Sequence, residues 1–121
     1  MTSESFENLR LELRRGCLIL AVLAALRTEQ YGYTLRKTLS AHGLAIDEST
    51  LYPLLRRLEA QGLLASQWRE EEKRNKRFYV VTPEGSLILQ QLLAEWLTID
   101  SSIHAVLKEH NGTKEQDHGT D

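Results

Sequence analysis

The sequence predicts a mainly helical α+β fold, in which three helices precede a small β-hairpin and one long helix follows it. Three observations lead to this prediction. As far as Gly62, leucines and other apolar residues recur at helical spacing in three segments. Two short runs, LASQWRE and KRFYVVT, then show the alternation and the aromatic and β-branched residues of strands. After Pro83, a single long segment carries an apolar heptad stripe.

The composition is that of one globular domain. The 121 residues include 41% hydrophobic and 26% charged residues, and the formal net charge is −2. Charge acts locally, however, and residues 31–82 hold nine Lys+Arg against six Asp+Glu. The single cysteine, Cys17, cannot form an internal disulfide, which fits a reducing cytoplasm. Its apolar run, CLILAVLAAL, is much shorter than the roughly 20 residues of a membrane span, so no membrane partner is expected.

The first three helices have recognisable limits. The first is expected at about 6–26, amphipathic in its first half and then apolar nearly all round, before the break TEQYG. The second is expected at about 33–42, and Gly43 follows it as a typical C-terminal cap. The third begins near Asp47, a good N-cap residue, and ends at Gly62.

The hairpin follows directly. Between its two strand-like runs lies EEEKRN, which is polar and lacks glycine, and this predicts a longer loop rather than a tight turn. Trp68, at the end of the first run, is expected to anchor the hairpin to the rest of the domain. Three helices followed by a hairpin is the order of a winged helix-turn-helix. We therefore assign residues 1–82 to the N-terminal helix and a winged helix-turn-helix DNA-binding domain.

The last helix is expected from Pro83 to about Lys108, because Thr82 is a good N-cap residue and proline suits the first helical position. Its apolar stripe predicts a coiled seam with the same helix of a second copy, so residues 83–109 form a dimerisation helix in this interpretation. Residues 110–121 are polar and are expected to be disordered. The stripe consists of Leu89, Leu92, Trp96, Ile99, Ile103 and Val106.

The third helix has two different faces. Leu51, Leu54, Leu55 and Leu58 share the inward face. The opposite face is either solvated surface or the part that enters a DNA major groove, where arginine binds guanine and small side chains approach base edges. Tyrosine and proline are unusual choices for a plain helix surface and favour DNA contact. The residues expected to contact DNA are Ser49, Thr50, Tyr52, Pro53 and Arg56 in this helix, and Arg74, Lys76 and Arg77 in the wing.

The string STLYPLLRRLEAQGLL, the basic hairpin ending KRFYVVTPEG and the leading YGYTLRKTL together resemble the PadR family of bacterial transcriptional regulators. The resemblance covers roughly residues 18–107, and the single C-terminal helix is similar to the family's shorter subgroup. It implies a homodimeric winged-helix repressor of an inverted-repeat operator, in which the third helix reads the major groove. It also implies relief by a small, frequently aromatic effector. The three consecutive glutamates, residues 70–72, depart from the basic wing expected of the family.

Trp96 has two interpretations. It either packs as dimer-interface core, which is the simpler reading, or two copies part to sandwich a flat aromatic molecule. His42, His104, His110 and His118 do not have metal-ligand spacing, and no catalytic constellation is recognisable, so we expect no metal, no cofactor and no enzyme activity. The sequence is compatible with two functions: a dimeric DNA-binding repressor that responds to an effector, and a winged-helix protein-interaction module without direct DNA binding.

Overall fold

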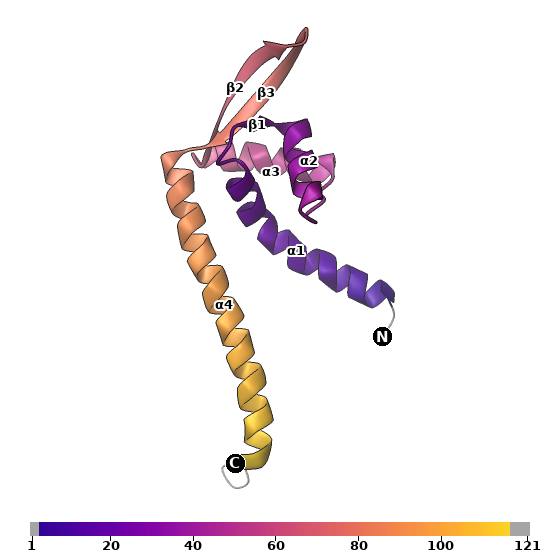
Figure 1. The fold of residues 1–121 in the computed structure, drawn as a ribbon, viewed down its shortest axis with the longest axis vertical. Helices are drawn as coiled ribbons and strands as arrows, with labels where there is room; N and C mark the ends of the chain where they lie inside the picture. Colours follow the sequence, from indigo (N-terminus) through magenta and orange to yellow (C-terminus); the bar gives the residue numbers. More distant parts are fainter. Residues whose placement is uncertain (1–2, 117–121) are drawn as a thin grey trace. The chain divides into compact units, whose positions relative to one another are not determined.

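The structure, a computed structural model, describes the backbone of residues 3–116 and the side chains of residues 3–109. It divides into two units, Met1–Leu89 and Gln90–Asp121. The elements, drawn in Figure 1, confirm the mainly helical α+β fold with a long final helix. They are α1 (Ser3–Ala25), β1 (Gln30–Tyr31), α2 (Gly32–Ala41), α3 (Glu48–Ala60), β2 (Leu64–Glu71), β3 (Arg74–Val81) and α4 (Pro83–Gln116).

The core of the first unit is built mainly from leucines of the three helices that precede the hairpin. Those of α3 are the leucines whose helical spacing marked its inward face in the sequence, and each buried side chain contributes about 1.5–3 kcal/mol. The side chains with less than 2% of their surface exposed are Val22, Leu23, Leu26, Leu35, Leu51, Leu55 and Leu58.

The end of α3 and the start of α4 are tied together by a single hydroxyl. Gly62 has φ +80°, and the Leu63 amide donates to the Leu58 carbonyl at 2.9 Å, which closes α3. The Thr82 hydroxyl donates to the Gly62 carbonyl at 2.7 Å and accepts from the Gly85 amide at 2.9 Å. The predicted N-cap role of Thr82 is therefore confirmed, and the same side chain fixes where α4 leaves the hairpin.

The wing differs from the predicted long loop. Strands β2 and β3 are antiparallel and pair from Leu64↔Val81 up to Glu71↔Arg74, which leaves a turn of only Glu72 and Lys73. Both turn residues have positive φ, 52° and 64°, as a two-residue hairpin turn of the type I′ kind requires. Such turns usually carry glycine or asparagine, and EEEKRN has an asparagine only outside the two turn positions. The sequence therefore did not predict a two-residue turn.

The sheet has a third strand that the sequence pattern did not predict. Its order is β1-β3-β2, and Gln30 and Tyr31 of β1 pair with Tyr79 and Phe78. Two residues are too few to show an alternating pattern in the sequence. The strand forms because the edge of β3 is free to pair with it. In Figure 1, β1 lies at the base of the hairpin, and the rest of the hairpin extends beyond it as a wing.

Two further expectations need correction. Trp68 does not anchor the hairpin, since 61% of its surface is exposed. Helix α4 continues to Gln116, past the expected boundary at Glu109, because these polar residues include no proline and an existing helix extends at little cost. The expected disordered segment 110–121 therefore begins inside the helix, and its last residues, 117–121, lie outside the described part of the chain.

Candidate nucleic-acid interface

Helix α3 presents the expected residues on its outer face. Its leucines are buried against the core, so Ser49, Thr50, Pro53 and Arg56 are all exposed. Arg56 makes no ion pair with any described residue. A long cationic side chain on a rigid helix, with no partner of its own, is available for a phosphate or for a guanine edge.

Pro53 lies well inside α3, in its second turn, and the helix continues through it. Proline has no backbone N–H, so the Ser49 carbonyl four residues earlier receives no helical hydrogen bond from it. Because Pro53 is exposed, the cost falls on a carbonyl at the surface, where water or a ligand can satisfy it. The proline therefore leaves a backbone acceptor near the start of the exposed face.

The hydroxyls of Ser49 and Thr50, at the start of α3, are bonded to Asp47, the residue that precedes the helix. Asp47 occupies the N-cap position, and its carboxylate accepts a hydrogen bond from the Ser49 hydroxyl. Hydrogen bonds from the side chains of Ser49 and then Thr50 hold the pKa of Asp47 below its usual value. Each hydroxyl has a single proton, so Ser49 or Thr50 would have to give up its bond to Asp47 in order to donate to a DNA acceptor.

Tyr52 is half-buried, unlike its neighbours on α3. A Cβ atom on Gly32 would lie 2.4 Å from the Tyr52 hydroxyl oxygen and 2.6 Å from Cε1. The Tyr52 ring therefore packs directly on the first residue of α2, and Gly32 is needed to make room for it. This contact fixes the position of α3 relative to α2, a role that the spacing of Tyr31-Gly32 and Leu51-Tyr52 did not indicate.

One face of the wing adjoins α3. Arg77 of β3 pairs with Glu59 of α3 at 2.9 Å and donates to the Ser66 hydroxyl at 2.9 Å. Burial raises the pKa of Tyr79 at the base of this face, and the charges of Arg77, Glu59 and Arg56 also act on it. The exposed face of α3 and this face of the wing therefore form one continuous surface.

Trp68 extends this surface toward the tip. The Arg77 guanidinium lies 5.6 Å from the centre of the Trp68 ring, within the range of a cation–π contact. On the strand ladder Trp68 is paired directly with Arg77, which explains why the indole is near the arginine although it lies far from the core.

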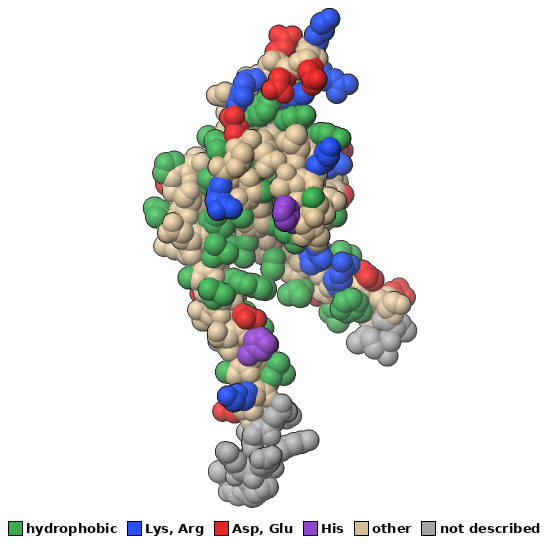
Figure 2. Space-filling view, in the orientation of Figure 1, with side chains coloured by type: hydrophobic (Ala, Val, Ile, Leu, Met, Phe, Trp, Pro, Cys, Tyr) green, Lys and Arg blue, Asp and Glu red, His purple; other side chains and the backbone are tan. Residues whose placement is uncertain are grey.

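The opposite face of the wing carries Lys76, which is largely enclosed. Its ammonium lies 4.5 Å from the centre of the Tyr31 ring, 3.4 Å from the Tyr31 hydroxyl, and 3.5 and 3.3 Å from Glu71 and Glu72. Arg69, on the same face, stacks on Phe78 and pairs with Glu29. Figure 2 shows the resulting mixture of acidic and basic side chains at the end of the hairpin.

Of the three wing residues expected at DNA, Arg74 alone is exposed and makes no ion pair within the described residues. Lys76 and Arg77 form ion pairs with glutamates of the same chain. The assignment of Ser49, Thr50, Tyr52, Pro53, Arg56, Arg74, Lys76 and Arg77 to DNA contact remains a prediction.

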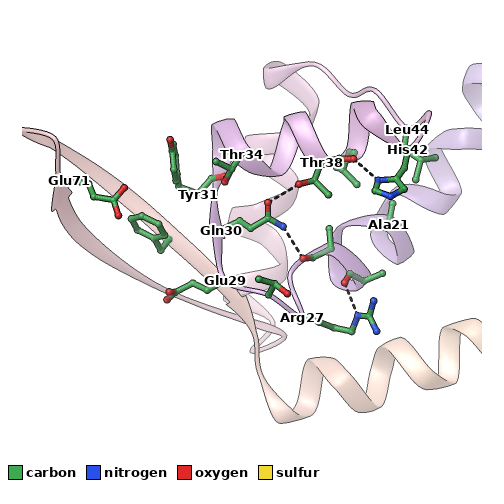
Figure 3. Close-up of a pocket in the computed structure, with 15 residues that line it drawn as sticks. Ala21, Arg27, Glu29, Gln30, Tyr31, Thr34, Thr38, His42, Leu44 and Glu71 are labelled. Carbon is green, nitrogen blue, oxygen red and sulfur yellow. Dashed lines mark hydrogen bonds between the residues drawn. The ribbon is translucent and has the colours of Figure 1, made fainter.

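A groove of about 860 Å³ lies between the end of α1, β1, α2 and the wing, which contributes Phe78 and Glu71 (Figure 3). Its inner polar groups bond to one another: the Gln30 side-chain amide donates to the Ala25 carbonyl, and the Thr38 hydroxyl donates to Gln30 Oε1, each at 3.0 Å. His42 Nδ1 lies 2.9 Å from the Thr38 carbonyl. The Thr38–Gln30 bond holds β1 beside α2, and the Gln30–Ala25 bond ties β1 to the end of α1.

In the second unit, α4 exposes most of its apolar stripe in the single chain. Trp96, Ile99, Ile103 and Val106 are all at least 40% exposed, and Leu93 and Leu97 beside them are exposed as well. Leu89 differs, because it is only 6% exposed and belongs to the core of the first unit. The stripe available to a partner therefore begins at Leu92, which is half-buried.

Other classes of site find no support within the described residues. No group of three His, Cys, Asp or Glu side chains is placed to hold a metal ion in that part of the chain. None of its helices has both the length and the apolar content that a bilayer span requires.

The chain is similar to known transcriptional regulators. The model of the transcriptional regulator PadR-like family matches residues 19–91. Transcriptional regulator Rv3488 of Mycobacterium tuberculosis is 41% identical over 81 residues, which are 66% of this chain and 76% of the relative. A PadR family transcriptional regulator from Eggerthella lenta has a solved structure with TM-score 0.84 and 42% identity, over 87% of this chain and 94% of that one. A transcriptional regulator from Clostridium thermocellum gives TM-score 0.72 and 28% identity, over 78% and 96%.

Proposed function

Because the chain belongs to the PadR-like family of transcriptional regulators, we propose that it is a homodimeric, cytoplasmic repressor of an inverted-repeat operator, relieved by a small aromatic effector. Membership of the family makes the protein a DNA-binding regulator of transcription and not an enzyme. The homodimer, the repressor role, the operator symmetry and the effector belong to the proposal.

The observation that carries the proposal is the continuous surface formed by the outer face of α3 and the adjoining face of the wing. Arg56 lies on the exposed side of α3, and Arg77 of the wing pairs with Glu59 of the same helix at 2.9 Å. A helix of this kind enters the major groove with its N-terminal half, and a hairpin beside it reaches the neighbouring backbone. The expected base-contacting residues are therefore near the start of α3, and the phosphate-contacting residues are on the wing.

Salt dependence separates this function from a protein-interaction module. If n phosphates are neutralised, the logarithm of the affinity falls with the logarithm of salt concentration with a slope of about −0.9n. The test is fluorescence anisotropy with the full chain and a duplex recovered by in vitro selection from a random library. If selection recovers no preferred duplex and binding to any duplex is independent of salt, the interaction module is the better account.

Arg56→Ala is expected to relax sequence preference. Loss of a bidentate arginine contact to guanine costs about 1–3 kcal/mol at one base position, which is roughly 5- to 150-fold in discrimination. Arg57→Ala is the matched control, because it removes the same charge from the adjacent, differently facing position of α3. The measurement is the affinity of both variants for single-base operator variants. Unchanged discrimination in Arg56→Ala would show that Arg56 is not a base reader.

The proposed dimer uses the stripe on α4 from Leu92 to Val106. These side chains are spaced for a coiled seam, and most are exposed in the single chain. The N-terminal half of α1 also exposes Phe6, Leu9 and Leu13 at helical spacing, and these are a second apolar set that a partner would cover. A dimer presents two copies of α3, so the half-sites of the operator are expected about one helical turn apart, roughly 34 Å.

The proposed effector site is at Trp96, which lies in the middle of the stripe and is 40% exposed in the single chain. A twofold axis near this position would bring two indoles together, either as packed core or around a flat aromatic molecule. An effector bound there would change the separation of the two α3 helices and reduce affinity for the operator.

Two single-tryptophan variants test the effector site. Binding of a planar aromatic dye is expected to quench emission strongly in Trp68→Phe, which retains Trp96. Trp96→Phe, which retains Trp68, is expected to lose this quenching, because the indole at the proposed site is gone, and to bind the dye about two- to fivefold more weakly, because a phenyl ring offers a smaller stacking face. Emission spectra and dye titrations measure both. Equal quenching in the two variants would contradict the sandwich and leave Trp96 as interface core.

A further inference from the structure

Three consecutive glutamates are unexpected in a hairpin that approaches DNA phosphates. The structure places Glu71 at the last ladder position of β2, opposite Arg74, and Glu72 in the two-residue turn. Glu72 is highly exposed and has φ 52°. The tight turn folds β3 back at once, so that Lys76 lies within reach of both carboxylates.

Lys76 is bound by four interactions inside the chain. Its ammonium contacts Glu71 Oε1 at 3.5 Å, Glu72 Oε1 at 3.3 Å and the Tyr31 hydroxyl at 3.4 Å, and it lies over the Tyr31 ring. Only 12% of its side chain is exposed. Burial by itself lowers the pKa of Lys76, but the hydrogen bonds to Tyr31 and Glu72 outweigh it, and the net pKa is raised. The side chain is therefore a full cation that is already neutralised.

The other basic residues of the hairpin divide into two groups. Arg69 and Arg77 are paired with Glu29 and Glu59, which belong to the body of the first unit and hold the hairpin to it. Lys73 and Arg74 make no ion pair within the described residues. Lys76 is different from both groups, because its acidic partners belong to the wing itself and lie at the tip.

We infer that Glu71 and Glu72 determine specificity by withholding Lys76 from the DNA backbone in complexes with non-operator DNA. This inference rests on the proposed function. In a non-specific complex, affinity comes almost entirely from neutralised phosphates. Lys76 would gain one phosphate there but lose two carboxylates and the Tyr31 contact, so it contributes little. On the operator, base contacts by α3 hold the wing at the backbone, where Lys76, on the face of the wing turned away from α3, can exchange its partners for a phosphate.

The test is the double substitution Glu71→Gln and Glu72→Gln, which keeps the shape of both side chains and removes both charges. Affinity for a shuffled duplex is expected to rise about three- to tenfold near 0.1 M salt, and the salt slope to become steeper by about one, because one more phosphate is neutralised. Affinity for the selected operator is expected to rise less, so the ratio of the two affinities falls. Circular dichroism and thermal unfolding confirm that the variant is folded.

Two controls isolate the role of Lys76. Glu12→Gln combined with Glu95→Gln removes the same net charge from α1 and α4, and both side chains are exposed. This control is expected to leave the salt slope and the affinity ratio unchanged. Adding Lys76→Gln to the wing double variant is expected to return the salt slope to that of the parent.

Each remaining outcome overturns the inference. If the parent discriminates between duplexes and the wing double variant keeps its ratio and slope, the glutamates do not set specificity. A steeper slope that persists without Lys76 means that the carboxylates repel DNA directly and do not act through this lysine. If both affinities rise equally, the glutamates weaken DNA binding in general. If selection with the parent protein recovers no preferred duplex, the proposed function is wrong, and the inference that rests on it is wrong as well.

Discussion

Ile103→Asp is expected to convert the protein to a monomer and to weaken binding to a two-half-site operator by a factor of about 100 or more. Ile103 lies within the stripe of α4 and is exposed in the single chain. In the proposed dimer it faces the partner, so the substitution buries two unpaired carboxylates at the seam, at a cost of several kcal/mol. A monomer also loses the second half-site contact, which in a linked pair raises affinity about 10²–10⁴-fold.

The matched control for this prediction is Ser101→Asp. Ser101 lies two residues earlier, on the opposite side of α4 from the stripe, so the same charge stays in solvent. Sedimentation of both variants and the parent gives the oligomeric state, and anisotropy with full and half operators gives the affinities. If Ile103→Asp sediments as a dimer and retains operator affinity, the stripe of α4 is not the dimer interface.

Local patterns in the sequence were sufficient for the helices and their ends. The leucines of α3 and the apolar stripe of α4 have helical spacing that depends only on nearby residues. Thr82 and Gly62 act within a few residues of their positions, as a cap and as a left-handed turn. For this reason the fold class and the limits of α2 and α3 could be predicted to within about two residues.

The errors concern features that depend on residues far apart in the chain. Strand β1 exists because β3 pairs with it, and Trp68 is exposed because the hairpin carries it away from the core. The pairing of Arg77 with Glu59 spans 18 residues and could not be inferred from a count of charges. The composition of the wing predicted basic side chains without ion-pair partners. In the structure, three of its five basic residues, Arg69, Lys76 and Arg77, are paired with glutamates.

Tyr52 illustrates the same limit at the candidate site. Its position on α3 is compatible with DNA contact, and the sequence offered no reason to expect otherwise. The structure shows that its ring packs on Gly32, so that the pair Tyr31-Gly32 and the pair Leu51-Tyr52 form one contact between α2 and α3. A residue can thus be required for DNA binding because it positions the reading helix, whether or not it also contacts the duplex.

Gly85→Ala is expected to destabilise the first unit by about 2–3 kcal/mol. A Cβ atom at this position would lie 2.1 Å from the Leu63 carbonyl oxygen and 2.6 Å from Val81 Cγ2. The Leu63 carbonyl accepts a hydrogen bond from the Thr82 amide at 3.0 Å, so it cannot move without breaking that bond. Overpacking of this kind typically costs 1–3 kcal/mol, and a clash with backbone belongs at the upper end. The better helix propensity of alanine offsets at most about 1 kcal/mol.

Gly16→Ala provides the opposite result in the same protein. Gly16 lies within α1, and a Cβ atom there meets nothing within 4 Å, so alanine is expected to stabilise the helix by up to about 1 kcal/mol. Denaturant unfolding at one fixed protein concentration measures both variants, since the stability of a dimer depends on concentration. A Gly85→Ala variant that unfolds at the same denaturant midpoint as the parent would show that α4 can begin without this close contact. The expected loss of stability would mean that Gly85 lets the first turn of α4 approach the end of α3. At this contact the helix proposed to carry the dimer interface meets the helix proposed to read DNA.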